Sequence, residues 1–123
     1  MIVKDGRIVS GGFNGREKLG SALWHAETEA VGRACAALGG WRLTGCALYV
    51  TLEPCPMCAG AVWNARIDRV VVGAKDARAG AFGSVLNLNS YPLNSKSDVV
   101  FGVREAESRE LLRRFFLERR GKA

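Results

Sequence analysis

The sequence lacks the features that would mark a membrane protein, a repeat protein or a chain of several domains. None of its apolar runs approaches the ~20 residues that a membrane-spanning helix needs, so no membrane segment is predicted. No internal repeat, low-complexity stretch or long linker occurs, and we expect one domain over residues 1–123. Lys4, Asp5 and Gly6 bring charge and a turn before any apolar region develops, which argues against a signal peptide and predicts a cytoplasmic protein.

The composition is that of a soluble globular protein with a basic surplus. Hydrophobic residues make up 48% of the chain and charged residues 24%, which is enough for a core and too apolar for a disordered tail. The 18 Lys and Arg residues outnumber the 12 Asp and Glu residues, which gives a net charge of +6, and half of this surplus lies in residues 104–123. Polyanions are therefore favoured partners, although a solvated outer face on a terminal helix would explain the same pattern.

Segments with strand patterns alternate with segments with helix patterns. The Asp5-Gly6 pair between the short apolar runs of 1–4 and 7–10 predicts an antiparallel hairpin. This alternation predicts an α/β fold with a central sheet that opens with the hairpin. Further strands are predicted at 47–52, 69–73 and 99–101, helices at 25–38, from Pro54 and Pro56 through Trp63 and at 104–120, and loops at 11–21 and 74–97.

Two apolar patterns predict how these elements are buried. The near-continuous apolar run at 47–52 is typical of a strand that is covered on both faces of its sheet. In the last helix, one apolar stripe runs among charged residues, and we expect the two phenylalanines in it to belong to the core. The stripe consists of Leu111, Leu112, Phe115 and Phe116.

The chemistry is concentrated in two cysteines and the single histidine. Cys55 and Cys58 form a C-x-x-C pair at a predicted helix start, a spacing that suits either a redox dithiol or two metal ligands. His25 and Glu27 form an H-x-E triplet, which together with P-C-x-x-C is the pattern of zinc-dependent nucleobase deaminases. We therefore predict Zn²⁺ bound by His25, Cys55 and Cys58, with the fourth tetrahedral position left for water. Glu27 is the predicted proton shuttle.

Competing interpretations of these residues explain less of the sequence. A thioredoxin-like dithiol leaves the triplet that begins at His25 unexplained. A structural zinc site would want a fourth Cys or His ligand. Cys35 lies ten residues along the helix from His25 and Cys46 begins a strand, so both are predicted to be buried thiols. An enzyme is the better interpretation.

The sequence around the second motif also resembles a known family. Residues 48–61 are LYVTLEPCPMCAGA and residues 64–76 are NARIDRVVVGAKD, and the likeness continues through Gly83-Ser84, Asn94 and residues 111–116. Over nearly its whole length the chain resembles the bacterial tRNA-specific adenosine deaminases. The resemblance implies a cytidine-deaminase-like three-layer sandwich, in which helices flank a central mixed five-stranded sheet, and a homodimer. It also implies hydrolytic conversion of adenosine to inosine at the wobble position of a tRNA anticodon.

The resemblance implies roles for three further residues. Asn14 matches the family's base-contacting asparagine, and Ala26 would contribute its backbone to substrate binding. Asp76 matches a position near the ribose of the target nucleotide, where a carboxylate can accept from a 2′-hydroxyl. From the residues alone, Asn14 also suits a turn between glycines and Asp76 also suits an ordinary loop carboxylate.

Three departures from the family pattern bear on folding and on substrate choice. Family members begin with a helix that is absent here, because Met1 falls within the first strand, so we expect apolar surface to be exposed on the sheet. Either the native start lies further upstream, or the helix at 104–120 and a partner subunit cover the gap. Trp24 replaces a residue that is commonly small, and Ser95 replaces the usual histidine. These two changes affect the choice of tRNA more than the chemistry.

Two other functions stay open at this point. The same site would suit a deaminase of a free nucleobase or nucleoside, such as guanine or cytosine. The chain could also be a catalytically silent zinc-binding subunit that binds tRNA or another single-stranded nucleic-acid loop. A binding module has no need of Glu27, which favours the enzyme.

Overall fold

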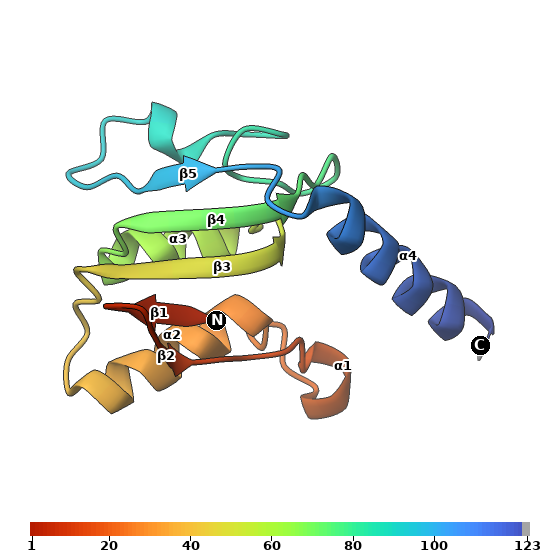
Figure 1. Ribbon diagram of the computed structural model, residues 1–123, viewed down its shortest axis with the longest axis horizontal. Coiled ribbons are helices and arrows are strands. Elements are labelled where there is room, and N and C mark those ends of the chain that lie inside the picture. The colour runs from red at the N-terminus through yellow and green to blue at the C-terminus, as the bar shows by residue number, and fades with distance from the viewer. Residues whose placement is uncertain (122–123) are drawn as a thin grey trace.

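A mixed sheet of five strands organises the computed structural model, which describes residues 1–121 (Figure 1). Lys122 and Ala123, at the end of the predicted domain, lie outside the described residues. The outer two strands on one side form the hairpin, β1 is antiparallel to both β2 and β3, and the other pairs are parallel. The predicted α/β fold with a mixed five-stranded sheet is therefore confirmed. In spatial order the strands are β2 (Arg7–Ser10), β1 (Ile2–Lys4), β3 (Cys46–Leu52), β4 (Arg69–Ala74) and β5 (Asp98–Val100).

The hairpin forms for the local reason that the sequence suggests. Asp5 and Gly6 both have positive φ, 51° and 73°, and Lys4 pairs with Arg7 across them. Two left-handed residues make a turn whose twist matches that of the flanking strands, and aspartate followed by glycine tolerates this backbone best.

Four α-helices accompany the sheet: α1 (Arg16–Leu19), α2 (Ala26–Leu38), α3 (Pro56–Ala65) and α4 (Glu105–Gly121), with a short 3-10 turn at Leu88–Ser90. The end of α2 at Gly39 follows from a left-handed φ of 75°. The segment containing α1 is predicted as a loop, and this prediction is wrong, because α1 is a helix of four residues. None of the four residues is buried, so the sequence carries no apolar pattern from which this helix could be predicted. Through residue 121, none of the helices is both long and apolar enough to cross a membrane.

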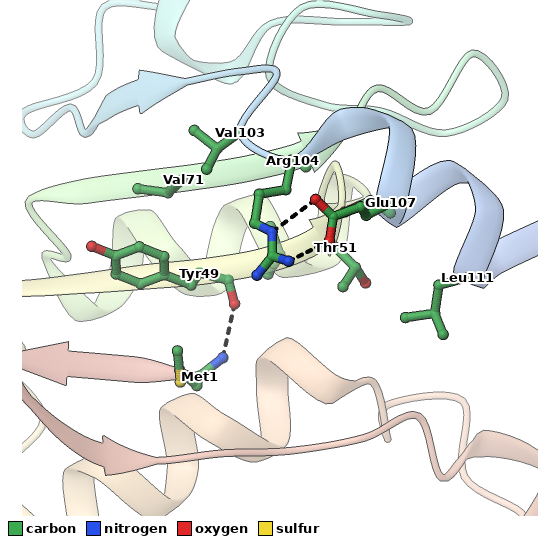
Figure 2. Close-up of a pocket in the computed structure, with 11 residues that line it drawn as sticks. Met1, Tyr49, Thr51, Val71, Val103, Arg104, Glu107 and Leu111 are labelled. Atoms are coloured by element: carbon green, nitrogen blue, oxygen red, sulfur yellow. Dashed lines mark hydrogen bonds and ion pairs between the residues drawn. The ribbon is translucent and has the colours of Figure 1, made fainter.

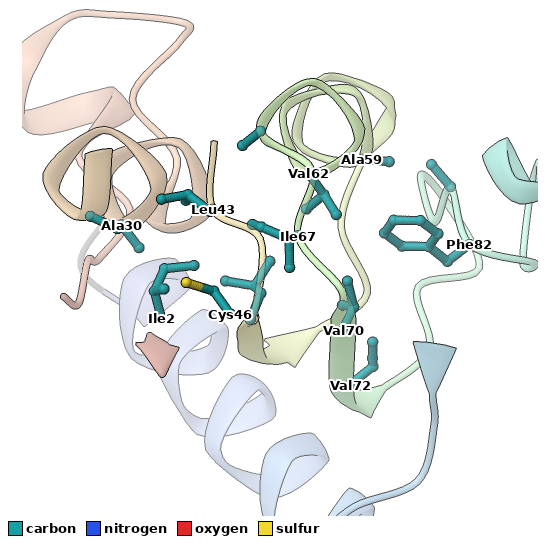
Figure 3. Close-up of a cluster of buried hydrophobic side chains, with 14 residues drawn as sticks. Ile2, Ala30, Leu43, Cys46, Ala59, Val62, Ile67, Val70, Val72 and Phe82 are labelled. Carbon is teal, nitrogen blue, oxygen red and sulfur yellow. The ribbon is translucent and has the colours of Figure 1, made fainter. Parts of the chain in front are cut away.

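The core lies between the sheet and the helices α2 and α3, which pack side by side on one face (Figures 1 and 3). Ile2, Leu48 and Val70 from three adjacent strands are fully buried there. Each such side chain contributes about 1.5–3 kcal/mol to folding. Cys46 is buried in the same cluster, as predicted, whereas Cys35 is half-buried beside it.

The opposite face of the sheet is only partly covered, by the first turns of α4. Gly73 of β4 packs directly on this helix, since a Cβ at residue 73 would lie 2.1 Å from the Ser108 hydroxyl oxygen. The later turns of the helix project away from the sheet (Figure 1). Phe115 and Phe116 are therefore 48% and 51% exposed, and the prediction that they belong to the core is wrong. The apolar stripe identifies the apolar side of the helix but not the surface that covers it.

A groove of about 440 Å³ separates α4 from the sheet (Figure 2). Tyr49 on its floor is 40% exposed, so β3 is not covered on both faces as its apolar run predicts. The Met1 amine donates to the Tyr49 carbonyl at 2.8 Å, and the Arg104 guanidinium pairs with Glu107 above. The expectation of exposed apolar surface is confirmed, because α4 covers this face of the sheet only in part.

Candidate metal centre

The starts of α2 and α3 bring the predicted metal ligands together. His25 immediately precedes α2 with an extended backbone, and its N–H donates to the Thr28 hydroxyl at 3.1 Å. Cys55 precedes α3 in the same way, with Pro56 at the first helical position, where the missing N–H had no partner to lose. The three predicted ligands thus lie at or within the first turn of two helices.

The distances between the ligand atoms suit a tetrahedral metal ion. His25 Nδ1 lies 3.6 Å from Cys55 Sγ and 3.4 Å from Cys58 Sγ, and the three ligand atoms all lie within 4.8 Å of one another. In a tetrahedral site with zinc bonds of about 2.3 Å to sulfur and about 2.0 Å to nitrogen, the sulfur and nitrogen atoms lie roughly 3.5 Å apart. The two nitrogen–sulfur distances therefore fit a zinc ion bound by these three residues.

The electrostatics of the cluster also call for a cation. Burial raises the pKa of the Cys58 thiol well above its ordinary value, and the nearby Glu27 carboxylate and Cys55 thiol raise this pKa further. A divalent cation among these groups would favour the thiolates and neutralise their charge. The Glu27 carboxylate is therefore close enough to Cys58 to influence its pKa.

Comparison with known protein families agrees with this geometry. The family model described as the cytidine and deoxycytidylate deaminase zinc-binding region matches residues 1–74, which contain the three ligands and Glu27. The chain belongs to this deaminase family. Zinc is the metal that the family description names, and the cluster of His25, Cys55 and Cys58 is able to hold it.

Several individual deaminases are similar to the chain over most of its length. A tRNA-specific adenosine deaminase of Bacillus subtilis (strain 168) is 46% identical over 99% of this chain and 76% of the relative. A structure from a study of A-to-I editing by tRNA:A34 deaminases at the wobble position has a TM-score of 0.86 and 44% identity, covering 89% of this chain and 80% of that one. A guanine deaminase from Bacillus subtilis has a TM-score of 0.59 and 31% identity, covering 76% and 69%.

Two of the predicted substrate residues lie near the start of α2. Asn14 is exposed, and its Oδ1 accepts from the Arg16 N–H at 3.0 Å, a local turn contact just before α1. Ala26 is the first residue of α2, where a backbone N–H has no acceptor within the helix. Gly12 lies against Ala26, since a Cβ at residue 12 would be 2.4 Å from the Ala26 carbonyl oxygen.

The third, Asp76, lies in a loop that is fixed by a residue to which the sequence assigns no role. Asp76 Oδ1 accepts from the N–H groups of Arg78 and Ala79, at 2.9 and 3.3 Å. Its own N–H donates to Glu53 Oε1 at 3.1 Å. Glu53 directly precedes Pro54 at the end of β3 and is 2% exposed. The sequence does contain a signal for this role of Glu53, because a charged residue directly follows an apolar strand.

Glu53 holds the loop by hydrogen bonds to its backbone. The N–H groups of Phe82 and Ser84 donate to Oε2 at 3.0 and 3.2 Å, and the Ser84 hydroxyl donates to Oε1. Burial raises the pKa of Glu53, but the hydrogen bonds from Ser84 and from backbone N–H groups outweigh it, so the pKa is lowered overall. Gly80 packs on this carboxylate, and a Cβ there would lie 2.4 Å from Glu53 Cδ.

Proposed function

We propose that the chain is a zinc-dependent hydrolase that converts adenosine to inosine at the wobble position of a tRNA anticodon. The observation that carries this proposal is the cluster of His25, Cys55 and Cys58 at zinc-ligand distances, with the Glu27 carboxylate against it. Similarity to tRNA-specific adenosine deaminases along 99% of the chain supports the choice of substrate.

Glu27 is the proposed proton shuttle. Zinc held by His25, Cys55 and Cys58 would supply the Lewis acidity that makes water a nucleophile at neutral pH. Glu27 takes a proton from the attacking water and delivers it to N1 of the adenine ring. It then takes the second proton from the new hydroxyl group on C6 and passes it to the departing amine, so that a C6 carbonyl remains. Adenosine and water thus give inosine and ammonia, with Glu27 returned to its starting state.

Asn14, Ala26 and Asp76 are proposed to hold the nucleotide. The Asn14 amide offers a donor and an acceptor to the edge of the purine. The Ala26 backbone N–H, free of an intrahelical acceptor, suits a further contact to the base. The Asp76 carboxylate would accept from the ribose 2′-hydroxyl and so favour RNA over DNA.

The proposed macromolecular partner is the tRNA, and the end of α4 offers it positive charge. Arg109 and Arg113 of α4, and Arg104 directly before it, each pair with a glutamate of this helix. Among residues 1–121 no such pair involves Arg114, Arg119 or Arg120, which are exposed. Unpaired arginines at a protruding helix end suit contacts with phosphates of the anticodon stem.

A homodimer through the outer face of α3 is also proposed. One face of α3 is buried, while Met57, Gly60 and Ala61 on the other are half-exposed and carry no polar side chain. An apolar face beside a metal centre suits a self-complementary contact between two copies.

Treatment of bacterial total tRNA, followed by sequencing, tests the reaction. Adenosine should read as guanosine at the wobble position of one or a few tRNAs. Glu27→Ala should lower this editing roughly 10²- to 10⁴-fold, the usual contribution of a general acid–base, with zinc still at one ion per chain. Loss of zinc from Glu27→Ala would contradict the assigned role.

Deamination of a free base is the second candidate, favoured by the similarity to a guanine deaminase. Incubation with guanine, cytosine, free nucleosides and single-stranded DNA in parallel separates the two. Ammonia release from guanine without editing of tRNA would replace the proposed substrate, and full zinc occupancy without any deamination would indicate a silent binding subunit.

A further inference from the structure

The segment 11–24 runs between β2 and α2, carries Asn14, and has little core of its own. Gly15 is the one buried residue that it contains, and α1 within it has none. A segment without buried side chains is held in place by a few specific contacts rather than by general packing. Its position beside the metal centre therefore depends on those contacts.

Trp24 makes two of these contacts, directly before the metal ligand His25. The Gly15 N–H donates to the Trp24 carbonyl oxygen at 3.1 Å. Gly15 also packs closely against the indole, because a Cβ at residue 15 would be 2.5 Å from Trp24 Cδ1. Residue 15 is thus held by both the backbone and the ring of Trp24, and Asn14 is its immediate neighbour.

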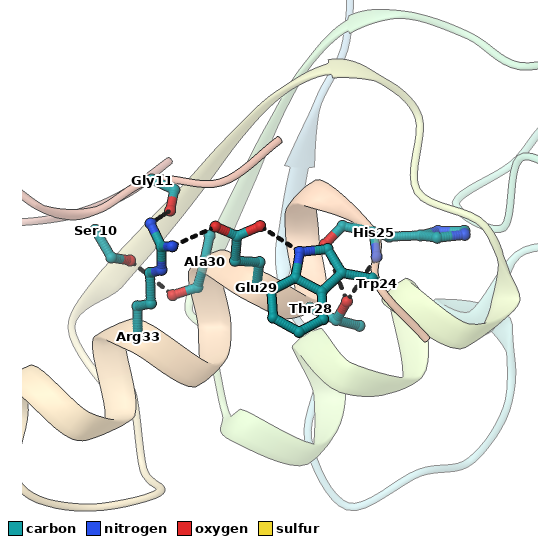
Figure 4. A network of polar contacts seen from close by, with 8 residues as sticks. All are labelled: Ser10, Gly11, Trp24, His25, Thr28, Glu29, Ala30 and Arg33. Atoms are coloured by element: carbon teal, nitrogen blue, oxygen red, sulfur yellow. Dashed lines mark hydrogen bonds and ion pairs between the residues drawn. The ribbon is translucent and has the colours of Figure 1, made fainter. Parts of the chain in front are cut away.

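Glu29 of α2 fixes the indole in turn (Figure 4). Trp24 Nε1 donates to Glu29 Oε2 at 2.7 Å, and Glu29 Oε1 lies 2.7 Å from Arg33 Nη2. The Glu29 side chain is 4% exposed, although the Trp24 residue keeps 38% of its surface. Hydrogen bonds to a buried carboxylate are the strong kind, so this pair defines where the indole lies.

The same chain of contacts reaches the other end of the segment. Arg33 Nη1 approaches the Gly11 carbonyl at 3.5 Å, and Gly12 packs on the carbonyl of Ala26. Both ends of the segment are therefore attached to the first two turns of α2, the helix that begins at the metal ligand.

We propose that Trp24 is a positioning residue for substrate binding. Its indole, fixed by Glu29 and packed on Gly15, holds the segment 11–24 so that Asn14 faces the target base. The inference rests on the proposed function for the role of Asn14, whereas the attachment of the segment stands on the contacts themselves. Without the indole hydrogen bond the segment moves away from the metal centre more often, and productive binding becomes rarer.

Limited proteolysis tests the attachment without any assay of activity. Trp24→Phe keeps an aromatic ring but removes the indole N–H, and trypsin cleavage after Lys18 should become roughly tenfold faster, the factor expected for one hydrogen bond to a charged group. Zinc should stay at one ion per chain. Glu29→Gln, which keeps an acceptor oxygen, should be cleaved more slowly than Glu29→Ala.

Trp41→Phe is the matched control, because Trp41 is half-exposed and lies after the end of α2, outside the segment. This variant should be cleaved after Lys18 at the wild-type rate. An unchanged rate of cleavage in Trp24→Phe would overturn the proposed attachment.

A double-mutant cycle tests whether the attachment acts through Asn14. Trp24→Phe and Asn14→Ala should each lower kcat/KM for tRNA, by roughly tenfold for the tryptophan variant. The double variant should be no slower than Asn14→Ala alone. Losses that multiply would show that Trp24 acts independently and would overturn the proposed role. If the wild-type protein edits no tRNA, the proposed function fails by itself, and proteolysis still decides the attachment.

Discussion

The carboxylate of Glu53 accepts four hydrogen bonds in a place that is almost closed to solvent. In Glu53→Gln the amide group faces donors that it cannot accept from, so the variant should be about 1–3 kcal/mol less stable at pH 7. Because the folded pKa of Glu53 lies below its unfolded value of about 4.3, the wild type's advantage is present above that pH and disappears as pH falls through the folded pKa. Urea unfolding of both proteins at pH 7 and in acid measures the difference.

Glu107→Gln is the control for this change, since Glu107 is an exposed carboxylate in a surface pair with Arg104 and should contribute little. Equal stability of Glu53→Gln and wild type at pH 7 would contradict the structural role of Glu53. A deficit that grows in acid would contradict the direction of its pKa shift.

At the same scale, sequence patterns reveal some functional residues and hide others. His25, Cys55 and Cys58 are predictable because metal coordination requires particular residue types at particular spacings. The roles of Glu53 and Trp24 are not, because their partners are backbone groups and a carboxylate that come close only after the chain has folded. Every residue except proline has a backbone N–H, so the sequence does not show which of these groups a buried carboxylate will bind.

Among the elements, the boundaries of α2 and α3 could be predicted because they depend on local chemistry. Gly39 ends one helix and Pro56 begins the other, and each acts through its own backbone. The direction of α4 could not be predicted, since its apolar stripe does not specify what lies opposite. The structure leaves the far part of this helix, with Phe115 and Phe116, exposed.

The contribution to RNA binding that we propose for the protruding end of α4 is testable. Arg119 lies over the Phe115 ring at 5.4 Å and Arg120 donates to the Phe116 carbonyl at 3.5 Å, which leaves both charges available to phosphates. The double variant Arg119→Ala/Arg120→Ala should weaken binding to an anticodon stem-loop and lower the slope of log affinity against log salt by roughly one to two. Titrations at several salt concentrations measure both quantities.

Arg109→Ala/Arg113→Ala removes the same charge from the same helix and is the matched control. These arginines pair with Glu105 and Glu110 at 2.9 and 2.6 Å, so their loss should change the salt slope less. Equal effects of the two double variants would mean that net charge alone, rather than the end of α4, attracts the RNA.

At the scale of the whole molecule, the homodimer proposed through the outer face of α3 can be tested with one substitution. Gly60 lies in the middle of this face, and a Cβ there would meet nothing within 4 Å, so Gly60→Arg fits the monomer. In a dimer the same arginine would place a charge in an apolar contact, and sedimentation should show a folded monomer with a single cooperative thermal transition. Gly32→Arg, on the exposed side of α2 with equally open space, should sediment as wild type does. A dimer that survives Gly60→Arg would exclude this face as the interface.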